Sequence, residues 1–430
     1  MMKKALVLSG GGTRGSYQNG AIHALRRLGK DDWDIVTGTS IGALNGMMVV
    51  QRDYRTMDRV WHTLTQDKVL NGNAPVDMDL TDMINERAQL VPFVKDFIKE
   101  RGADITPFIG YVEQLFDPDR FIGSTIDIGC ITCRHKDRSP VFVTKEMMME
   151  NGADWLISSA SAYPAFPVHK FEEGEFIDGG YYDNMPIDFA LRMGAEEIIG
   201  IDLSANPKHT NYFDRTGITY IFPQVETGLF LSFDRAVIDR LEILGYYDTM
   251  KAFGKFDGVR YTFELTDLPK WFDRFRLDML ILEERIRRAS EITNRLYSSQ
   301  VITDRLAQQQ HRRVIDDKRM FFGFMDNLMT ACNLDTERIW TYRAARNAVL
   351  AGFADCARED FEVWPDRISM DGILSHATKL STKGVVEKIM HTRLYPSHSF
   401  LGDGLLLTVY PFENALAVFL GELMNELKEE

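Results

Sequence analysis

Cysteine, basic charge and long apolar runs are all scarce in this sequence of 430 residues. Its four cysteines are too few for a disulfide framework in a chain of this size: Cys130, Cys133, Cys332 and Cys356. Lysines and arginines number 50 against 63 aspartates and glutamates, which leaves a formal net charge of −13. Nucleic-acid binding needs a basic surface, so we expect no nucleic-acid partner.

No apolar run approaches the ~20 residues that a membrane-spanning helix needs. Two lysines near the N-terminus precede an apolar run, as in a signal peptide, but the run from Ala5 to Leu8 is shorter than the roughly 7–15 residues required. The sequence therefore predicts a soluble, cytoplasmic protein that is at most peripheral at membranes. Hydrophobic residues make up 45% of the chain, which supports a large core and excludes wholesale disorder.

Cys130 and Cys133 have the C-x-x-C spacing of a metal or redox site. The sequence contains no second pair of this kind, and the segment from Ile126 to Cys133 has the apolar pattern of a buried strand. We therefore predict that both cysteines are structural and that the protein has no metal site.

Short β-branched runs alternate with helical patterns through the first two hundred residues. Ala5–Leu8 is typical of a buried strand, and apolar positions then recur at helical spacing over Ser16–Leu28. A second strand over Asp34–Gly38 precedes a second helix over Ile41–Val50. This alternation predicts an α/β fold, with a mostly parallel sheet flanked by helices.

The pattern changes after about residue 260, where long, charged, helix-forming stretches begin. Trp271–Met329 has apolar residues at helical spacing and contains no glycine before Gly323. We therefore divide the chain into an α/β domain over residues 1–260 and a largely helical region over residues 261–430.

The glycine-rich segment Gly10–Gly15, with the sequence GGGTRG, follows the first predicted strand and opens the first predicted helix. It matches the G-x-G-x-x-G fingerprint of dinucleotide-binding enzymes, with Asp31, Asp32 and Asp34 near the place of a ribose-binding acid. It equally suits an oxyanion hole, since successive glycines let backbone N–H groups point at one negative oxygen. A tight turn without a ligand is the third interpretation, and this segment alone does not decide among them.

A second glycine motif, Gly38–Gly42 with the sequence GTSIG, favours the oxyanion hole. It lies between a predicted strand and a predicted helix, which is the context of a nucleophile elbow. Its serine, Ser40, then occupies a sharp, strained turn. Gly38 and Gly42 lack the side chains that would block the close approach of strand and helix. We predict that Ser40 is a nucleophile.

A nucleophilic serine needs a base, and none of the nine histidines lies in an obvious catalytic context. His169, His391 and His398 are candidates only if the fold brings them to Ser40. Asp178 is a better candidate, because it precedes two glycines at the end of an apolar strand. Desolvation would raise its pKa from about 3.9 towards the working pH. The alternative is an aspartate that only hydrogen-bonds the backbone of its own turn.

Taken in order, these motifs resemble the patatin-like phospholipase family. The resemblance rests on GGGTRG after the first strand, GTSIG after the second, and DGG at Asp178 followed by the N-x-P of Asn184-Met-Pro186. Two further segments are similar to the family's pattern, Ser158–Pro167 and Met193–Leu203. The set covers residues 5–205, nearly half of the chain, and its order makes the resemblance specific.

The resemblance implies a serine lipid acyl hydrolase of the phospholipase A, lysophospholipase or esterase type, with a Ser–Asp dyad and neither metal nor cofactor. By position, Ser40 is the nucleophile and Asp178 its base, so that no histidine is needed. The other implied site residues are the elbow glycines Gly38 and Gly42, and the oxyanion-loop residues Gly10, Gly11, Gly12 and Arg14. The implied substrate is a phospholipid or lysophospholipid, reached by transient contact with a membrane surface.

The helical region matches no motif of the family, and we expect it to form a lid, an acyl-chain groove or the surface of a homodimer. Its run from Met320 to Met325 fits a lipid site, although such a run more often packs a core. Two alternative functions stay open. A Rossmann-type dinucleotide-binding enzyme would be indifferent to Ser40, and a vestigial hydrolase would act as a regulatory scaffold.

Overall fold

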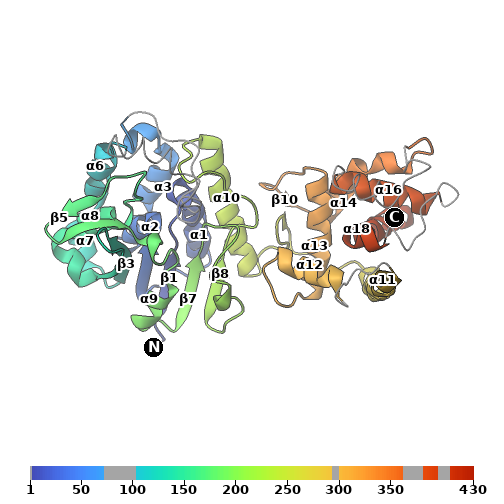
Figure 1. The fold of residues 1–430 in the computed structure, drawn as a ribbon, viewed down its shortest axis with the longest axis horizontal. Helices are drawn as coiled ribbons and strands as arrows, with labels where there is room; N and C mark the ends of the chain where they lie inside the picture. The colour runs from blue at the N-terminus through green and yellow to red at the C-terminus, as the bar shows by residue number, and fades with distance from the viewer. Residues whose placement is uncertain (1, 72–102, 293–299, 362–380, 396–406) are drawn as a thin grey trace. The chain divides into compact units, whose positions relative to one another are not determined.

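The computed structural model describes residues 2–71, 103–292, 300–361, 381–395 and 407–430. The chain divides into two compact units, Met1–Phe253 and Gly254–Glu430. In Figure 1 the first unit contains the sheet and its helices, and the second consists mainly of helices.

One mixed sheet organises the first unit. Its strands within the described residues are β1 (Lys4–Leu8), β2 (Ile35–Thr39), β3 (Asp127–Arg134), β4 (Pro140–Thr144), β5 (His169–Phe171), β6 (Gly174–Asp178), β7 (Glu197–Ile201) and β8 (Ile218–Ile221). The strand order is β5-β6-β3-β2-β1-β7-β8, and β4 also pairs with β3. Strands β3, β2, β1, β7 and β8 run parallel, whereas β4 and β6 run antiparallel to β3. The predicted mostly parallel sheet is therefore confirmed.

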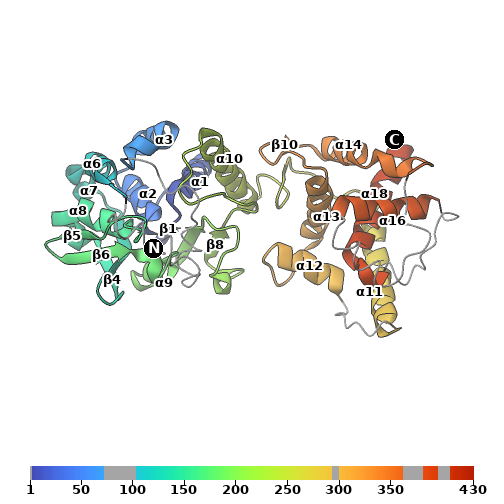
Figure 2. The ribbon, with the colours of Figure 1, turned by 45° about the horizontal axis from the view of Figure 1, so that its top comes forward.

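Helices cover both faces of this sheet because the side chains of a strand alternate between its faces. The α-helices of the unit within the described residues are α1 (Ser16–Arg27), α2 (Ile41–Val50), α3 (Tyr54–Thr63), α6 (Thr106–Leu115), α7 (Pro118–Gly123), α8 (Lys145–Ser159), α9 (Ile187–Arg192) and α10 (Arg235–Ala252). From β1, Leu6 and Leu8 enter a large core shared with α1, α2 and α10. Ala5 and Val7 enter a smaller core beside α9, which Figure 2 shows on the other side of the sheet.

The C-x-x-C segment forms part of strand β3, and both of its thiols are fully buried. Burial raises the pKa of Cys130, and it raises the pKa of Cys133 to about 12. Both cysteines are free. The prediction of a buried strand is confirmed, and the described residues include no cluster of side chains that could hold a metal ion.

The second unit packs its helices around α18. Its described elements are β9 (Thr262–Phe263), α11 (Phe272–Ile292), α12 (Val301–Gln309), α13 (Asp317–Ala331), β10 (Ile339–Trp340), α14 (Tyr342–Gly352), α16 (Thr382–Leu394) and α18 (Pro411–Glu429). From α18, the ring of Phe419 packs against Trp271, Phe275 and Phe321. The run from Met320 to Met325 contributes four fully buried residues to this core, so the prediction of a core role is confirmed.

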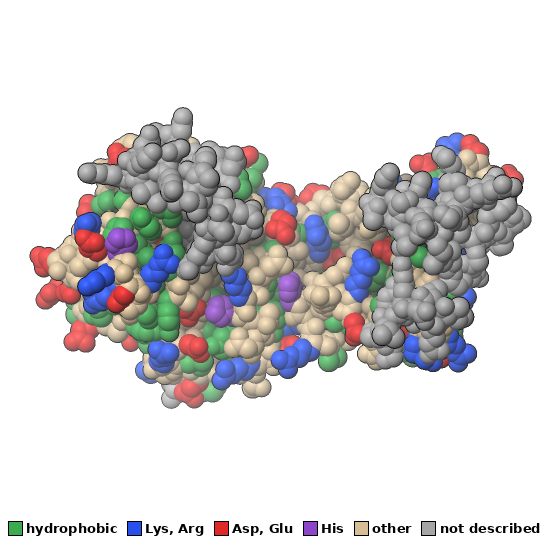
Figure 3. Space-filling model, viewed as in Figure 1, with side chains coloured by type: hydrophobic (Ala, Val, Ile, Leu, Met, Phe, Trp, Pro, Cys, Tyr) green, Lys and Arg blue, Asp and Glu red, His purple; other side chains and the backbone are tan. Residues whose placement is uncertain are grey.

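The described surface mixes charges of both signs. On the face that Figure 3 shows, lysine and arginine side chains lie among aspartates and glutamates in both units. Among the described residues, no helix combines the length and the apolarity that crossing a membrane would require.

Candidate active site

The C-terminal ends of β2 and β6 meet along one side of β3. Strand β2 runs parallel to β3 and places Thr39 opposite Ile131, whereas β6 runs antiparallel and places Asp178 opposite Thr132. The other side of β3 pairs with β4 across the same stretch. Because the two strand ends occupy consecutive positions on β3, the register of the sheet brings Ser40, the residue after Thr39, beside Asp178.

Ser40 lies in a strained turn between β2 and α2. Its backbone has φ 55° and ψ −127°, a conformation that residues other than glycine rarely adopt. Its side chain is buried, with the residue only 4% exposed. Its N–H donates a hydrogen bond to the Ser159 hydroxyl at 3.0 Å, which ties the turn to the end of α8. The backbone of the turn is therefore fixed to the end of α8, and Ser40 lies directly after the C-terminal end of β2.

Two glycines allow the chain to cross itself at this turn. A Cβ atom on Gly38 would lie 2.4 Å from the carbonyl oxygen of Gly42, and one on Gly42 would lie 2.3 Å from the carbonyl oxygen of Leu8. Both contacts are with backbone atoms, which have little room to move. The strand, the turn and the start of α2 can pack this closely only because neither residue has a side chain.

Asp178 is fully buried and uses its two carboxylate oxygens differently. Its Oδ1 accepts a hydrogen bond of 2.7 Å from the N–H of Gly180, while its Oδ2 accepts none from any described residue. Burial raises the pKa of Asp178 to about 6, although the N–H of Gly180 and the hydroxyl of Ser40 each favour the ionised form. Oδ1 thus caps the turn, and Oδ2 has a lone pair left for a proton.

The three glycines after β1 have different hydrogen-bonding roles. The N–H of Gly10 donates to the carbonyl oxygen of Asn184 at 3.0 Å, and the Asn184 side chain donates back to the carbonyl oxygen of Gly10 at 3.0 Å. The N–H groups of Gly11 and Gly12 donate to no described residue. Gly12 has φ +59°, and a Cβ atom there would lie 2.2 Å from the carbonyl oxygen of Phe230. Only glycine fits this position. With respect to the described residues, the N–H groups of Gly11 and Gly12 are thus left without an acceptor.

Arg14 and Asn184 shape this loop without joining the pocket beside it. Arg14 is buried, and its N–H donates to the carbonyl oxygen of Gly11 at 3.3 Å. Asn184 has no predicted role of its own beyond its place in the N-x-P motif Asn184-Met-Pro186. Its two hydrogen bonds to Gly10 hold the loop in place, and the signal that would have pointed to it was that motif.

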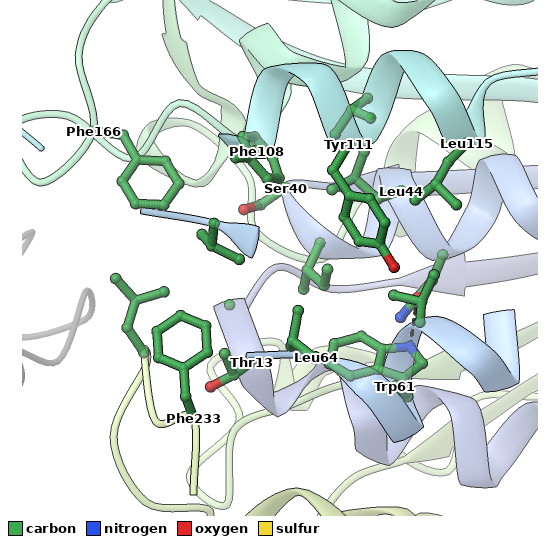
Figure 4. A pocket seen from close by; sticks show the side chains of 18 of the residues that line it. Thr13, Ser40, Leu44, Trp61, Leu64, Phe108, Tyr111, Leu115, Phe166 and Phe233 are labelled. Atoms are coloured by element: carbon green, nitrogen blue, oxygen red, sulfur yellow. Dashed lines mark hydrogen bonds between the residues drawn. The ribbon is translucent and has the colours of Figure 1, made fainter. Parts of the chain in front are cut away.

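An apolar pocket extends from Ser40 and contains about 730 Å³ of empty space, part of it open to solvent. Figure 4 shows the Ser40 side chain among aliphatic and aromatic side chains from α2, α3 and α6. Two polar side chains on its wall are engaged: Asn45 accepts a hydrogen bond of 3.1 Å from the Trp61 indole, and the Thr13 hydroxyl donates to the Phe230 carbonyl oxygen at 3.2 Å. Burial raises the pKa of the Tyr111 phenol, which also lines the pocket. Among the described lining residues, Ser40 therefore offers the hydroxyl best suited to chemistry.

The structure does not bring the other proposed side chains to this pocket. No histidine lines it within the described part of the chain. His169 instead pairs with Asp154 at 2.8 Å, His391 is buried in the second unit, and His398 lies outside the described residues.

The expected ribose-binding acids are also in the wrong place. Asp34 lies just before β2, where its carboxylate accepts a hydrogen bond from the N–H of Lys4 at 2.8 Å, and Asp32 pairs with the Lys4 ammonium group. These residues lie at the N-terminal ends of the parallel strands β1 and β2, whereas the glycine loop follows the C-terminal end of β1. A ribose-binding role for the three aspartates is therefore wrong. The dinucleotide-binding alternative is left with the glycine motif but without an acid to bind the ribose.

Comparison with known proteins agrees with the geometry of this site. Residues 6–191 match the family model described as patatin-like phospholipase. Over 217 residues the chain is 30% identical to mouse patatin-like phospholipase domain-containing protein 7, covering 49% of this chain and 14% of that protein. It is 28% identical over 214 residues to lysophospholipase NTE1 of Scheffersomyces stipitis, covering 49% and 12%. The chain thus matches only a small part of each of these relatives.

Among solved structures, the chain is similar to the crystal structure of VipD from Legionella pneumophila. The sequence identity is 16% and the TM-score 0.39, over 99% of this chain and 93% of that one. The family model ends within the first unit and includes both motifs that meet at β3. Residues 6–191 of this chain, which lie within the α/β unit, thus match the patatin-like phospholipase family.

Proposed function

We propose that this protein is a serine lipid acyl hydrolase that cleaves fatty-acyl esters of phospholipids or lysophospholipids through a Ser40–Asp178 dyad. The observation that carries this proposal is a buried serine that lines an apolar pocket and that follows a strand end next to a buried aspartate, at consecutive positions along β3. The names of the relatives agree with it, since one is called a lysophospholipase and the other carries a patatin-like phospholipase domain.

The proposed reaction begins with proton transfer from the Ser40 hydroxyl to Oδ2 of Asp178. The serine oxygen attacks the ester carbonyl, and the resulting oxyanion accepts hydrogen bonds from the N–H groups of Gly11 and Gly12, and from that of Ile41 at the start of α2. Such preorganised donors are worth ~2.7–4 kcal/mol each in comparable sites. The alcohol leaves with the proton from Asp178, and water activated by the same carboxylate then releases the fatty acid from Ser40.

This mechanism divides the four predicted oxyanion-loop residues into two groups. Gly11 and Gly12 supply donors, because their N–H groups have no other described partner. Gly10 and Arg14 support the loop, because their N–H groups are already bonded to Asn184 and Gly11.

The pocket suggests how a fatty-acyl chain would bind. Ser40, which precedes α2, and Leu44 and Met48 within α2 all line it and are spaced four residues apart. At 1.5 Å per residue they mark a path of ~12 Å along the helix, away from the nucleophile. We place the acyl chain on this path, where its burial contributes to binding roughly 0.8 kcal/mol for each CH₂ group.

The substrate class adds two further proposals about partners. A phospholipid presented in a bilayer requires transient contact with the membrane surface. The helical unit Gly254–Glu430 is available as a lid or as the surface of a homodimer. Sedimentation of the protein alone tests for the homodimer, and sedimentation with vesicles tests for the membrane contact.

The function is tested by assaying a short-chain chromogenic ester, a fluorogenic phospholipid and a lysophospholipid. Wild type is expected to hydrolyse at least one of them, and Ser40→Ala and Asp178→Asn are expected to reduce turnover to background. Ser158→Ala serves as the matched control, because Ser158 is equally buried and its hydroxyl contacts no described partner. A wild type inert on all three esters would favour the vestigial scaffold instead.

A further inference from the structure

One buried hydroxyl connects the nucleophile turn to the central strand of the site. Ser159, the last residue of α8, is fully buried. Its hydroxyl accepts the N–H of Ser40 at 3.0 Å and donates to the carbonyl oxygen of Ile131 at 2.7 Å. Ser159 therefore bridges the main chain of Ser40 to β3 by two short hydrogen bonds.

The same strand holds the other member of the dyad. Asp178 lies opposite Thr132 in the sheet, and the Thr132 hydroxyl donates to the carbonyl oxygen of Ile177 at 2.8 Å. Consecutive residues of β3 thus hold both strand ends, Ile131 through Ser159 and Thr132 directly. The distance between the Ser40 hydroxyl and the Asp178 carboxylate is set by how firmly each end is fixed to this strand.

The Ser40 turn depends on such a support more than an ordinary turn would. A non-glycine residue at φ 55° is strained, and strain persists only where the surroundings enforce it. Among the described residues, the Ser159 hydroxyl is the partner of the Ser40 N–H. Removing that hydroxyl also removes the hydrogen bond that it donates to the buried Ile131 carbonyl oxygen. We therefore expect the turn to shift.

We propose that Ser159 is a positioning residue that holds the Ser40 turn against β3 and so aligns the Ser40 hydroxyl with Asp178. This inference rests on the proposed function only in assuming that Ser40 is the nucleophile. It assigns a chemical role to one residue of the segment Ser158–Pro167, whose sequence resembles the pattern of the family but does not by itself indicate a function.

The test uses Ser159→Cys, which has a similar shape but a thiol that donates and accepts hydrogen bonds weakly. Its matched control is Ser158→Cys, the same change at the neighbouring buried serine, whose hydroxyl has no described partner. The measured quantities are kcat and KM for a soluble ester, the rate at which a fluorophosphonate labels Ser40, and the thermal unfolding temperature. The labelling rate requires no knowledge of the natural substrate.

We expect Ser159→Cys to lower kcat and the labelling rate at least ~10-fold, since misplacement of a reacting group by about 1 Å can cost 10²-fold. KM should stay close to that of Ser158→Cys, whereas the unfolding temperature should fall by several degrees, because an unsatisfied buried polar group costs about 1–3 kcal/mol. The rise of the rate with pH should also move to higher pH, because the Ser40 hydroxyl lowers the pKa of Asp178 and would do so less from a displaced position.

Equal kcat and labelling rates in Ser159→Cys and Ser158→Cys would overturn the inference. If Ser159→Cys does not fold, Ser159→Ala removes the hydroxyl without adding atoms, and the same comparison is made with Ser158→Ala. A wild type that is labelled but hydrolyses no lipid ester leaves the inference testable and contradicts only the proposed substrate. A wild type that is neither labelled nor active overturns both.

Discussion

At the scale of the residue, Asp178 combines two demands that conflict in most proteins. It must be buried to lie against Ser40, yet it must be ionised to accept a proton. With its pKa raised to about 6, the carboxylate is mostly ionised at neutral pH and is a stronger base than an exposed aspartate. In the proposed mechanism, the fold therefore supplies a base without a histidine.

The first prediction concerns the pH dependence of the reaction. The value of kcat/KM should rise with pH through about 6 and then level off, because only the ionised Asp178 accepts the Ser40 proton. The measurement is kcat/KM for a short-chain ester between pH 4.5 and 8.5. A profile that is flat across pH 5 to 7 would show that another group is the base.

A second prediction is that Asp178→Asn stabilises the protein at neutral and alkaline pH. The pKa is about 6 in the folded state and near 3.8 in the unfolded state, so stability is lost as the pH rises through this interval. The loss reaches about 3 kcal/mol above pH 7, and asparagine avoids it while its Oδ1 still accepts the Gly180 N–H.

Thermal unfolding measured at pH 4 and pH 8 tests this prediction. The unfolding temperature of Asp178→Asn should exceed that of wild type at pH 8, and the two should converge at pH 4. Ser40→Ala keeps the buried carboxylate and should show no such gain. A variant less stable than wild type at pH 8 would refute the argument.

At the scale of the element, the crossing of β1, β2 and α2 gives the third prediction. Gly42→Ala should destabilise the protein by several kcal/mol or prevent its accumulation, because the new Cβ would lie 2.3 Å from the Leu8 carbonyl oxygen. Gly110→Ala in α6 is the control, since its Cβ meets nothing within 4 Å and alanine favours a helix by about 1 kcal/mol. The free energies of unfolding of the two variants are measured in urea. Equal values would contradict the close packing of β1 against the start of α2.

The path along α2 gives the fourth prediction. Met48→Trp should fill the pocket two turns beyond Ser40 and lower kcat/KM for long-chain esters by about 10-fold or more, while short-chain esters are affected little. The ratio of kcat/KM for long-chain esters to kcat/KM for short-chain esters is compared between variant and wild type, so that the short-chain ester controls for a general loss of activity. A uniform change across chain lengths would show that the acyl chain lies elsewhere.

Local features of the site could be predicted from the sequence, whereas its long-range supports could not. Helix α2 has the predicted bounds Ile41–Val50, because a glycine turn marks its start and a run that is apolar except for Asn45 marks its extent. The hydrogen bonds of Asn184 to Gly10 and of Ser159 to Ser40 join residues 174 and 119 positions apart. No periodicity encodes such pairs. The expected ribose-binding position of the aspartates before β2 was wrong for the same reason, because distance along the sequence does not tell at which edge of a sheet a residue lies.

At the scale of the whole molecule, the chain has separate cores. The buried clusters of the first unit contain residues up to Leu244, and the buried cluster of the second begins at Tyr261. Since each unit buries its own apolar surface, the fifth prediction is that calorimetry resolves two unfolding transitions. At pH 8, Asp178→Asn should raise only one of them. A single transition that moves as a whole would contradict this independence.

The central claim is that Ser40 is the nucleophile and Asp178 its base. Intact-mass spectrometry after reaction with a fluorophosphonate tests it most directly, followed by assignment of the modified peptide. Wild type should gain one adduct at Ser40, and Ser40→Ala should gain none. Asp178→Asn should react at least about 100-fold more slowly than wild type. An adduct on another serine, or equal rates for wild type and Asp178→Asn, would contradict the account.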